Sequence, residues 1–180
     1  MRLDQYIAVL DACVLAPMPV ADTLLRLAEE PALYTPRWSP DILGEIDRTL
    51  LKKFGYTEIQ VARRLDVMRA TFPDASVDGY QDLIAAMKNH SKDRHILAAA
   101  VKCGAHAIVS DNDKHFPEEA LAPYGIECLT ADQFLEHQYH LDPDSFISVL
   151  IQQARDIRYT LPQLISKHVP CLSKLIITKR

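Results

Sequence analysis

The 180-residue sequence lacks the features of several protein classes. No apolar run approaches the roughly 18 residues that a membrane span requires. The N-terminal residues 1–11 contain an acid and a tyrosine where a signal peptide needs an uninterrupted apolar stretch. The four cysteines lie far apart and form no C-x-x-C pair, which argues against a zinc ribbon or a thioredoxin-like motif. We therefore expect a cytoplasmic protein with no membrane association.

Positive charge is also in short supply, because the net charge is −4 with histidine neutral. A protein that binds nucleic acid through a basic surface alone is usually positive. Bound cations or a local basic strip would have to offset the acidity of this chain if it handles nucleic acid. The 48% apolar and 24% charged residues are typical of a globular protein, and the length suits one domain with a sizeable core.

Candidate strands and helices alternate over residues 1–135. Short apolar runs at 6–10, 107–110 and 126–129 predict buried strands, and 32–38 predicts a further strand or extended piece. Helices are predicted between them at 22–29, 40–54, 57–72, 82–87 and 93–103. This alternation predicts an α/β sandwich with a mostly parallel sheet. Residues 143–158 and 161–175 predict a helical pair after it.

Local signals mark where several of these helices begin. Ser39 is a candidate N-cap, with Pro40 at the first helical position. Gly104 is expected to end the helix that opens near residue 93. Two capping boxes predict further helix starts: Thr57 with Gln60, and Thr130 with Gln133.

Acidic and amide-bearing residues occur in four segments that can converge where a parallel sheet places its ligands, beyond the carboxyl ends of the strands. Asp11 follows the first buried run, and residues 111–113 follow the strand at 107–110. Asp93 lies in the first turn of a helix, and Glu45 could join from the second turn of its own helix. Clustered carboxylates raise one another's pKa values, and a bound Mg²⁺ or Mn²⁺ relieves that repulsion. Such a site can hydrolyse phosphodiester bonds without a protein nucleophile.

Each of these residues also has a purely structural interpretation. Asp11 could cap the next segment, and Glu45 in isolation would be an ordinary exposed helix carboxylate. Asp93 could be a helix N-terminal acid, while Asp111 and Asp113 could simply favour a turn.

Four segments in order resemble the PIN-domain nucleases, in the branch that includes the VapC-like toxins. They are residues 9–15, 38–46, 92–100 and 108–117, and the resemblance covers roughly residues 5–135. It implies a PIN-like three-layer sandwich, a mostly parallel sheet flanked by helices. The nuclease domain would be residues 1–135, and residues 136–180 would form a helical C-terminal extension of the same unit.

The resemblance also implies a set of site residues. Asp11, Glu45 and Asp93 would be catalytic metal ligands for Mg²⁺ or Mn²⁺, and Ser110 would help orient a carboxylate or a water. Many family members have an aspartate where this chain has Asn112. The fourth member of the cluster is therefore a choice among three neighbours: Asp111, Asn112 and Asp113. Four further residues would border the pocket and meet substrate phosphates: Arg94, His95, Lys114 and His115.

The function implied is a metal-dependent endoribonuclease, the toxin of a type II toxin–antitoxin pair. It would act on RNA, bind a cognate antitoxin protein and form a homodimer. One alternative is a catalytically silent PIN module that serves as an RNA- or protein-binding scaffold, which Asn112 keeps open. A phosphohydrolase of the haloacid-dehalogenase type is less favoured, because it needs a second acid where Cys13 stands.

Other polar residues are expected to have no catalytic part. Cys13 is assigned to packing, and Arg94 could pair with Asp93 instead of meeting a phosphate. His137 and His140 are interpreted as surface residues despite their metal-like spacing. The basic pairs at 52–53 and 63–64 could track RNA but are first expected to be solvated. The apolar residues of the C-terminal tail could form a dimer or partner surface: Leu172, Leu175, Ile176 and Ile177.

Overall fold

A computed structural model describes residues 6–168 of the chain. Its sheet has four parallel strands in the order β2-β1-β3-β4, so the predicted α/β fold with a parallel sheet is confirmed. The strands are β1 (Ile7–Leu10), β2 (Thr35–Arg37), β3 (Ala107–Val109) and β4 (Glu127–Leu129). In the register of the sheet, Val9 lies beside Arg37 on one side and Ile108 on the other. Because all strands run the same way, their carboxyl ends share one edge.

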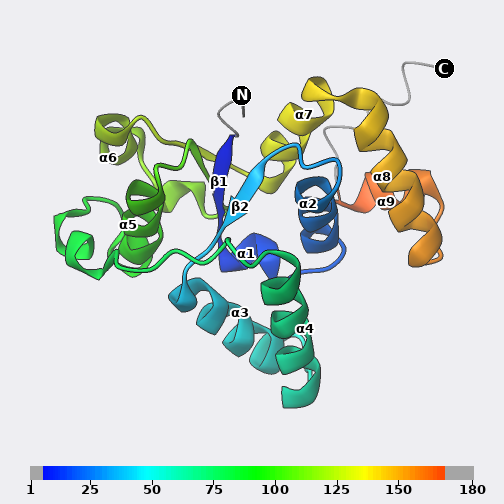
Figure 1. Ribbon diagram of the computed structural model, residues 1–180, viewed down its shortest axis with the longest axis horizontal. Coiled ribbons are helices and arrows are strands. Elements are labelled where there is room, and N and C mark those ends of the chain that lie inside the picture. The colour runs from blue at the N-terminus through cyan, green and yellow to red at the C-terminus, as the bar shows by residue number, and fades with distance from the viewer. Residues whose placement is uncertain (1–5, 169–180) are drawn as a thin grey trace.

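Helices flank this sheet on both faces. Figure 1 shows α5 on one side and α2, α7 and α8 on the other, while α3 and α4 extend together beyond the carboxyl ends of the strands. The helices up to the third strand are α1 (Ala12–Leu15), α2 (Val20–Glu29), α3 (Pro40–Lys53), α4 (Glu58–Thr71) and α5 (Arg94–Cys103). Those after it are α6 (Glu118–Leu121), α7 (Ala131–Leu141), α8 (Pro143–Asp156) and α9 (Leu161–His168). None of the helices within residues 6–168 is long and apolar enough to cross a membrane.

The helix starts follow the predicted capping signals. The Ser39 hydroxyl accepts a hydrogen bond from the Ile42 backbone N–H at 3.2 Å, with Pro40 at the first position of α3. Both predicted capping boxes are formed, at the starts of α4 and α7. Gly104 ends α5 with a φ of 64°, a left-handed conformation that a residue without a Cβ adopts at little cost.

Some elements are shorter or tighter than the sequence indicates. The residues predicted as a helix at 82–87 form a 3₁₀ helix, η1 (Gln81–Ala86), and a second one, η2 (Ser91–Asp93), precedes α5. The loop at 111–115 contains η3 (Asp113–His115), and η4 (Ala122–Tyr124) follows α6. β2 covers only three residues and contains Pro36. An edge strand tolerates a proline, which has no backbone N–H, because no neighbouring strand requires a hydrogen bond on its outer side.

The core lies between the central strands and the helices on each face. Ala8, Val9 and Leu10 of β1 are fully buried. On α5, the three alanines at 98–100 are also fully buried. Their small side chains let α5 pack closely against β1 and β3, and this fixes the position of the residues at its N-terminus.

The C-terminal helices pack onto the rest of the molecule through buried polar contacts. Gln153 on α8 accepts a hydrogen bond from the Thr23 hydroxyl at 2.7 Å and donates one to the Pro19 carbonyl at 3.0 Å. Arg26 on α2 also pairs with Asp156 at 2.8 Å. The predicted boundary after residue 135 falls inside α7, which is continuous from 131 to 141. The tail with Leu172, Leu175, Ile176 and Ile177 lies outside the described residues.

Replacing Gln153 with alanine should lower the free energy of unfolding by about 1–3 kcal/mol, because two hydrogen bonds of Gln153 are lost and the Thr23 hydroxyl and Pro19 carbonyl keep only the bonds between Thr23 and Pro19. Urea denaturation measures this change. Gln152→Ala on the same helix is the matched control, since Gln152 is exposed. Equal stability of the two variants would show that α8 is not anchored through Gln153.

Candidate active site

Asp11 lies directly after β1, in the middle of the sheet. Its backbone N–H donates to the Val109 carbonyl at 3.0 Å, and its side chain is only 4% exposed. The Ser110 hydroxyl donates a hydrogen bond of 2.6 Å to Oδ2 of Asp11, and the Cys13 thiol donates one of 3.1 Å to the same oxygen. These contacts hold the carboxylate in a single orientation at the carboxyl edge of β1 and β3.

The environment of Asp11 disfavours its charged form. Burial raises the pKa of the Asp11 carboxyl, and the nearby charges of Asp93 and Glu45 raise it further. The hydrogen bonds from Ser110 and Cys13 lower it, but only in part, so the net direction is upward. A cation beside Asp11 would therefore be stabilised by the charge that the protein alone does not compensate.

Glu45 reaches the same region from the second turn of α3. Nε2 of His95, on α5, lies 3.2 Å from Oε1 of Glu45. Burial by itself lowers the pKa of His95, but contact with Glu45 and the charges of Asp41 and Asp93 outweigh it and raise that pKa. His95 thus holds Glu45 in place across the gap between two helices.

Asp93 ends η2 and is the N-cap residue of α5. Its Oδ2 lies 2.6 Å from Nδ1 of His115, which lies in η3 after β3. The backbone carbonyl of Asp93 accepts a hydrogen bond of 3.0 Å from the Asn89 side chain. Hydrogen bonds therefore hold both the side chain and the backbone carbonyl of Asp93 in place.

The three candidates for the fourth position differ in where they point. Oδ1 of Asp111 accepts a 3.0 Å hydrogen bond from the Ala131 N–H at the start of α7. Asp113 accepts one of 2.9 Å from the Lys114 N–H and lines a separate hollow. Asn112 donates its backbone N–H to the Ser110 hydroxyl at 3.1 Å and lines the same pocket as Asp11. Geometry therefore brings Asn112, and neither aspartate, to the acids.

One pocket of about 710 Å³ joins these residues. Asp11, Glu45, Asp93 and Asn112 line it. Residues of the later turns of α3 and its C-cap also line it: Arg48, Thr49, Lys52, Lys53 and Phe54. The pocket thus has an acidic part and a basic part.

The donors of the acidic part suit a hard divalent cation. They are carboxylate oxygens and one amide oxygen, which Mg²⁺ and Mn²⁺ accept together with water. Within residues 6–168, no lysine or arginine forms an ion pair with Asp11, Glu45 or Asp93. The excess negative charge and the raised pKa of Asp11 fit a cation at this position.

The other predicted site residues are spread more widely. Ser110 is fully buried against Asp11. Arg94 donates to the Asn89 carbonyl at 3.3 Å and forms no ion pair with Asp93, contrary to the structural alternative considered for it. His95 lies against Glu45 and His115 against Asp93. Lys114 is exposed in η3.

The basic pairs also differ from one another. Lys52 and Lys53 line the pocket, and Arg63 is exposed on α4. Arg64 is not a solvated residue, because its guanidinium donates to the carbonyls of Leu15 and Ala16 at 2.5 and 3.0 Å. It connects α4 to the short helix that follows Asp11.

Sequence reasoning missed three residues near the acids. Arg48 and Thr49 follow Glu45 by three and four positions, which is the spacing of one helix face. That spacing, carried on to Lys52, is a signal the sequence does contain. His90 was also missed, because its neighbour His115 lies 25 positions away.

A comparison with known proteins found a relative of this chain. The chain is 53% identical over 73 residues to a Mycobacterium tuberculosis protein named "Putative ribonuclease VapC50". The predicted resemblance to VapC-like PIN-domain proteins is confirmed. The matched segment spans 41% of this chain and 43% of that relative, so less than half of either is compared. No family model matches the chain, and no solved structure matches it.

The raised pKa of Asp11 should affect the melting temperature of the protein. A raised pKa means that the folded state holds the Asp11 proton more tightly, so stability falls as pH rises through that pKa. In EDTA at neutral pH, the Tm of Asp11→Asn should therefore lie above that of the wild type. The expected increase is about 2–4 °C for each kcal/mol by which removal of the buried charge raises the free energy of unfolding. The difference in Tm between Asp11→Asn and the wild type should become smaller near roughly pH 4, where the usual aspartate pKa lies.

Divalent ions should reverse that order. Excess Mg²⁺ or Mn²⁺ should raise the Tm of the wild type and leave Asp11→Asn unchanged, as followed by differential scanning fluorimetry. Asp74→Asn, an exposed aspartate outside the pocket, is the control and should behave as wild type. An equal metal-induced shift in Asp11→Asn would exclude Asp11 as a ligand.

Proposed function

We propose that this chain is a Mg²⁺- or Mn²⁺-dependent endoribonuclease that acts in the cytoplasm as the toxin of a toxin–antitoxin pair. The observation that carries the proposal is the pocket lined by Asp11, Glu45, Asp93 and Asn112 together with a basic wall, which consists of Arg48, Lys52 and Lys53. The relative named as a ribonuclease supports RNA as the substrate class.

The acidic part of the pocket would hold the metal. Asp11, Glu45 and Asp93 supply charged oxygens, and Asn112 supplies a neutral amide oxygen. When bound, the ion supplies a Lewis acid for the phosphodiester and lowers the pKa of a water. The protein keeps the ligands in place, with Ser110 and Cys13 on Asp11, His95 on Glu45 and His115 on Asp93.

These supporting contacts also control protons. The pKa of His95 is raised beside Glu45, which favours the protonated ring, and that form would offset part of the negative charge. Ser110 and Cys13 keep their protons directed at Oδ2 of Asp11. Neither of them donates to Oδ1 of Asp11, so that oxygen remains available. The metal ion and the substrate would therefore approach Asp11 from the side of Oδ1.

The basic wall would bind the RNA strand next to the bond that is cleaved. Arg48, Lys52 and Lys53 line the pocket without an ion pair to any acid within residues 6–168, so their charges are free for phosphates. Phe54 is 43% exposed beside Lys53, whose Nζ lies 5.9 Å from the ring centroid. An exposed aromatic ring beside cations favours an unpaired base, which supports a single-stranded or looped substrate.

Two partners belong to the same proposal. A cognate antitoxin would block the pocket with a basic side chain directed at the acids, because within residues 6–168 no lysine or arginine pairs with them. A second copy of the chain would form a homodimer. If the chain were instead a silent scaffold, RNA would bind without being cut, and a cleavage assay distinguishes the two.

The cleavage prediction concerns Asp11. Asp11→Asn should lower the rate of Mg²⁺- or Mn²⁺-dependent cleavage of a mixed single-stranded RNA pool by about a hundredfold or more, because a charged group at the reacting centre is removed. EDTA should abolish cleavage by the wild type. Gel analysis of the products measures both.

Asp74→Asn is again the control and should cleave at the wild-type rate. Undiminished cleavage by Asp11→Asn would contradict the mechanism. Binding of RNA by the wild type with no products in either metal would contradict enzymatic function and favour the scaffold.

The basic wall is tested separately. Lys52→Ala with Lys53→Ala should raise the KM for RNA and reduce the slope of log affinity against log salt by about two, one for each phosphate that is no longer neutralised. Lys102→Ala with Arg155→Ala changes net charge equally at exposed positions outside the pocket and serves as the control. Identical salt slopes in the two double variants would exclude the wall as an RNA-binding surface.

A further inference from the structure

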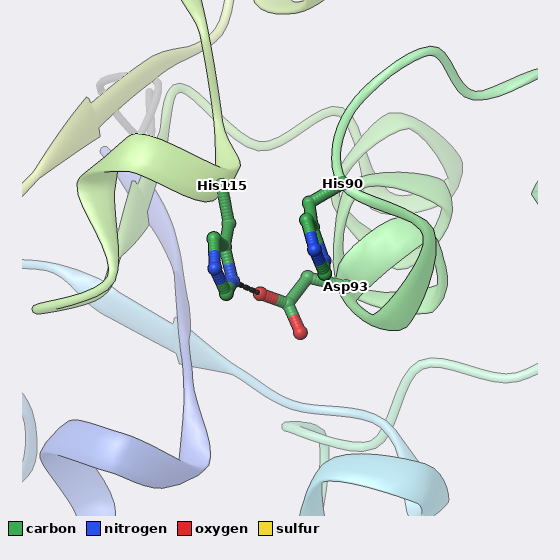
Figure 2. A group of neighbouring side chains, drawn as sticks. All are labelled: His90, Asp93 and His115. Atoms are coloured by element: carbon green, nitrogen blue, oxygen red, sulfur yellow. Dashed lines mark hydrogen bonds and ion pairs between the residues drawn. The ribbon is translucent and has the colours of Figure 1, made fainter.

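A second group of metal-ligating side chains adjoins the acidic pocket. His90, Asp93 and His115 come from the segment before η2, the end of η2 and the end of η3, and Figure 2 shows both rings beside the Asp93 carboxylate. One ligand atom from each lies within 4.8 Å of the other two. The two imidazoles are stacked, with ring centroids 4.0 Å apart and planes 11° from parallel.

Backbone hydrogen bonds hold these ligands together. The His90 N–H donates to the His115 carbonyl at 3.0 Å, which ties the two segments directly. The Asp93 N–H donates to the His90 carbonyl at 2.9 Å. The Lys92 N–H reaches Nδ1 of His90 only at 3.4 Å, a long bond that yields at small cost. The backbone segments that carry the three side chains are therefore held together before any ligand binds.

The donor set differs from that of the acidic pocket. Two imidazoles with one carboxylate are typical of a Zn²⁺ site with three protein ligands and an open fourth position, whereas Mg²⁺ prefers oxygen alone. Zn²⁺ bonds of about 2.0–2.1 Å separate tetrahedral ligands by about 3.3 Å. The 2.6 Å contact of His115 with Asp93 thus has to open slightly, and the other ligand atoms, which lie within 4.8 Å of one another, have to adjust to that separation.

We propose that His90, Asp93 and His115 bind a borderline divalent cation of the Zn²⁺ type. Asp93 lies at the boundary between this site and the oxygen-only pocket, which it also lines. The inference does not rest on RNA cleavage, because ion binding is a property of these three side chains alone. Its consequence is that Zn²⁺ and Mg²⁺ would select different sides of one carboxylate.

The experiment uses the full chain without RNA, with excess Mg²⁺ present to occupy the oxygen-only pocket. Zn²⁺ is titrated against a chromophoric chelator, and Co²⁺ serves as an optical probe. We expect one tight equivalent of Zn²⁺ and Co²⁺ d–d bands that indicate nitrogen ligation. His90→Gln with His115→Gln should weaken Zn²⁺ binding by more than about a hundredfold, since even outer-shell changes cost 10- to 100-fold.

His137→Gln with His140→Gln is the matched control, because both histidines lie on α7, away from the three ligands. It should bind as wild type, and circular dichroism should show both double variants folded. Zn²⁺ affinity that is equal in the two double variants would overturn the proposal, as would Co²⁺ bands without nitrogen ligation in the wild type. A failure of RNA cleavage alone affects neither readout, so failure of the proposed function is distinguishable.

Discussion

The 2.6 Å hydrogen bond from Ser110 to Asp11 joins the ends of the two central strands, and the pocket is built around it. Ser110 in turn donates its backbone N–H to Leu129, so three strand ends are connected at one point. The cost of this arrangement is a buried carboxylate with a raised pKa. A compensating cation is the simplest physical reason for a protein to keep an acid there.

Features set by local physics could be predicted from the sequence. Capping residues act on backbone groups two or three positions away, so Ser39, Thr57 and Thr130 indicated where helices begin. Asp11 could be placed at the carboxyl end of a strand because a buried apolar run stops there. The parallel sheet follows from the alternation of strands with helices, since each crossover requires a connection of that length.

Choices decided by long-range contacts could not be predicted. Asp111 and Asn112 are neighbours with similar local signals, yet the Ala131 N–H binds Asp111 from 20 positions away, whereas Asn112 lines the same pocket as Asp11. Arg64 resembles any solvated basic residue until the carbonyls of Leu15 and Ala16 are brought beside it. These partners belong to other elements, so only the folded chain identifies them.

Helix α3 explains how a chain of net charge −4 could handle an anionic polymer. Glu45 lies in its second turn, and Lys52 and Lys53 lie in its last turn, the end at which the helix dipole favours cations. Seven residues at about 1.5 Å each separate Glu45 from Lys52 by about 10 Å along the axis. One helix thereby presents the proposed metal ligand and the proposed phosphate-binding group to the same pocket at a fixed spacing. Overall charge is a poor guide to such a site, because local separation of charge along one element is sufficient.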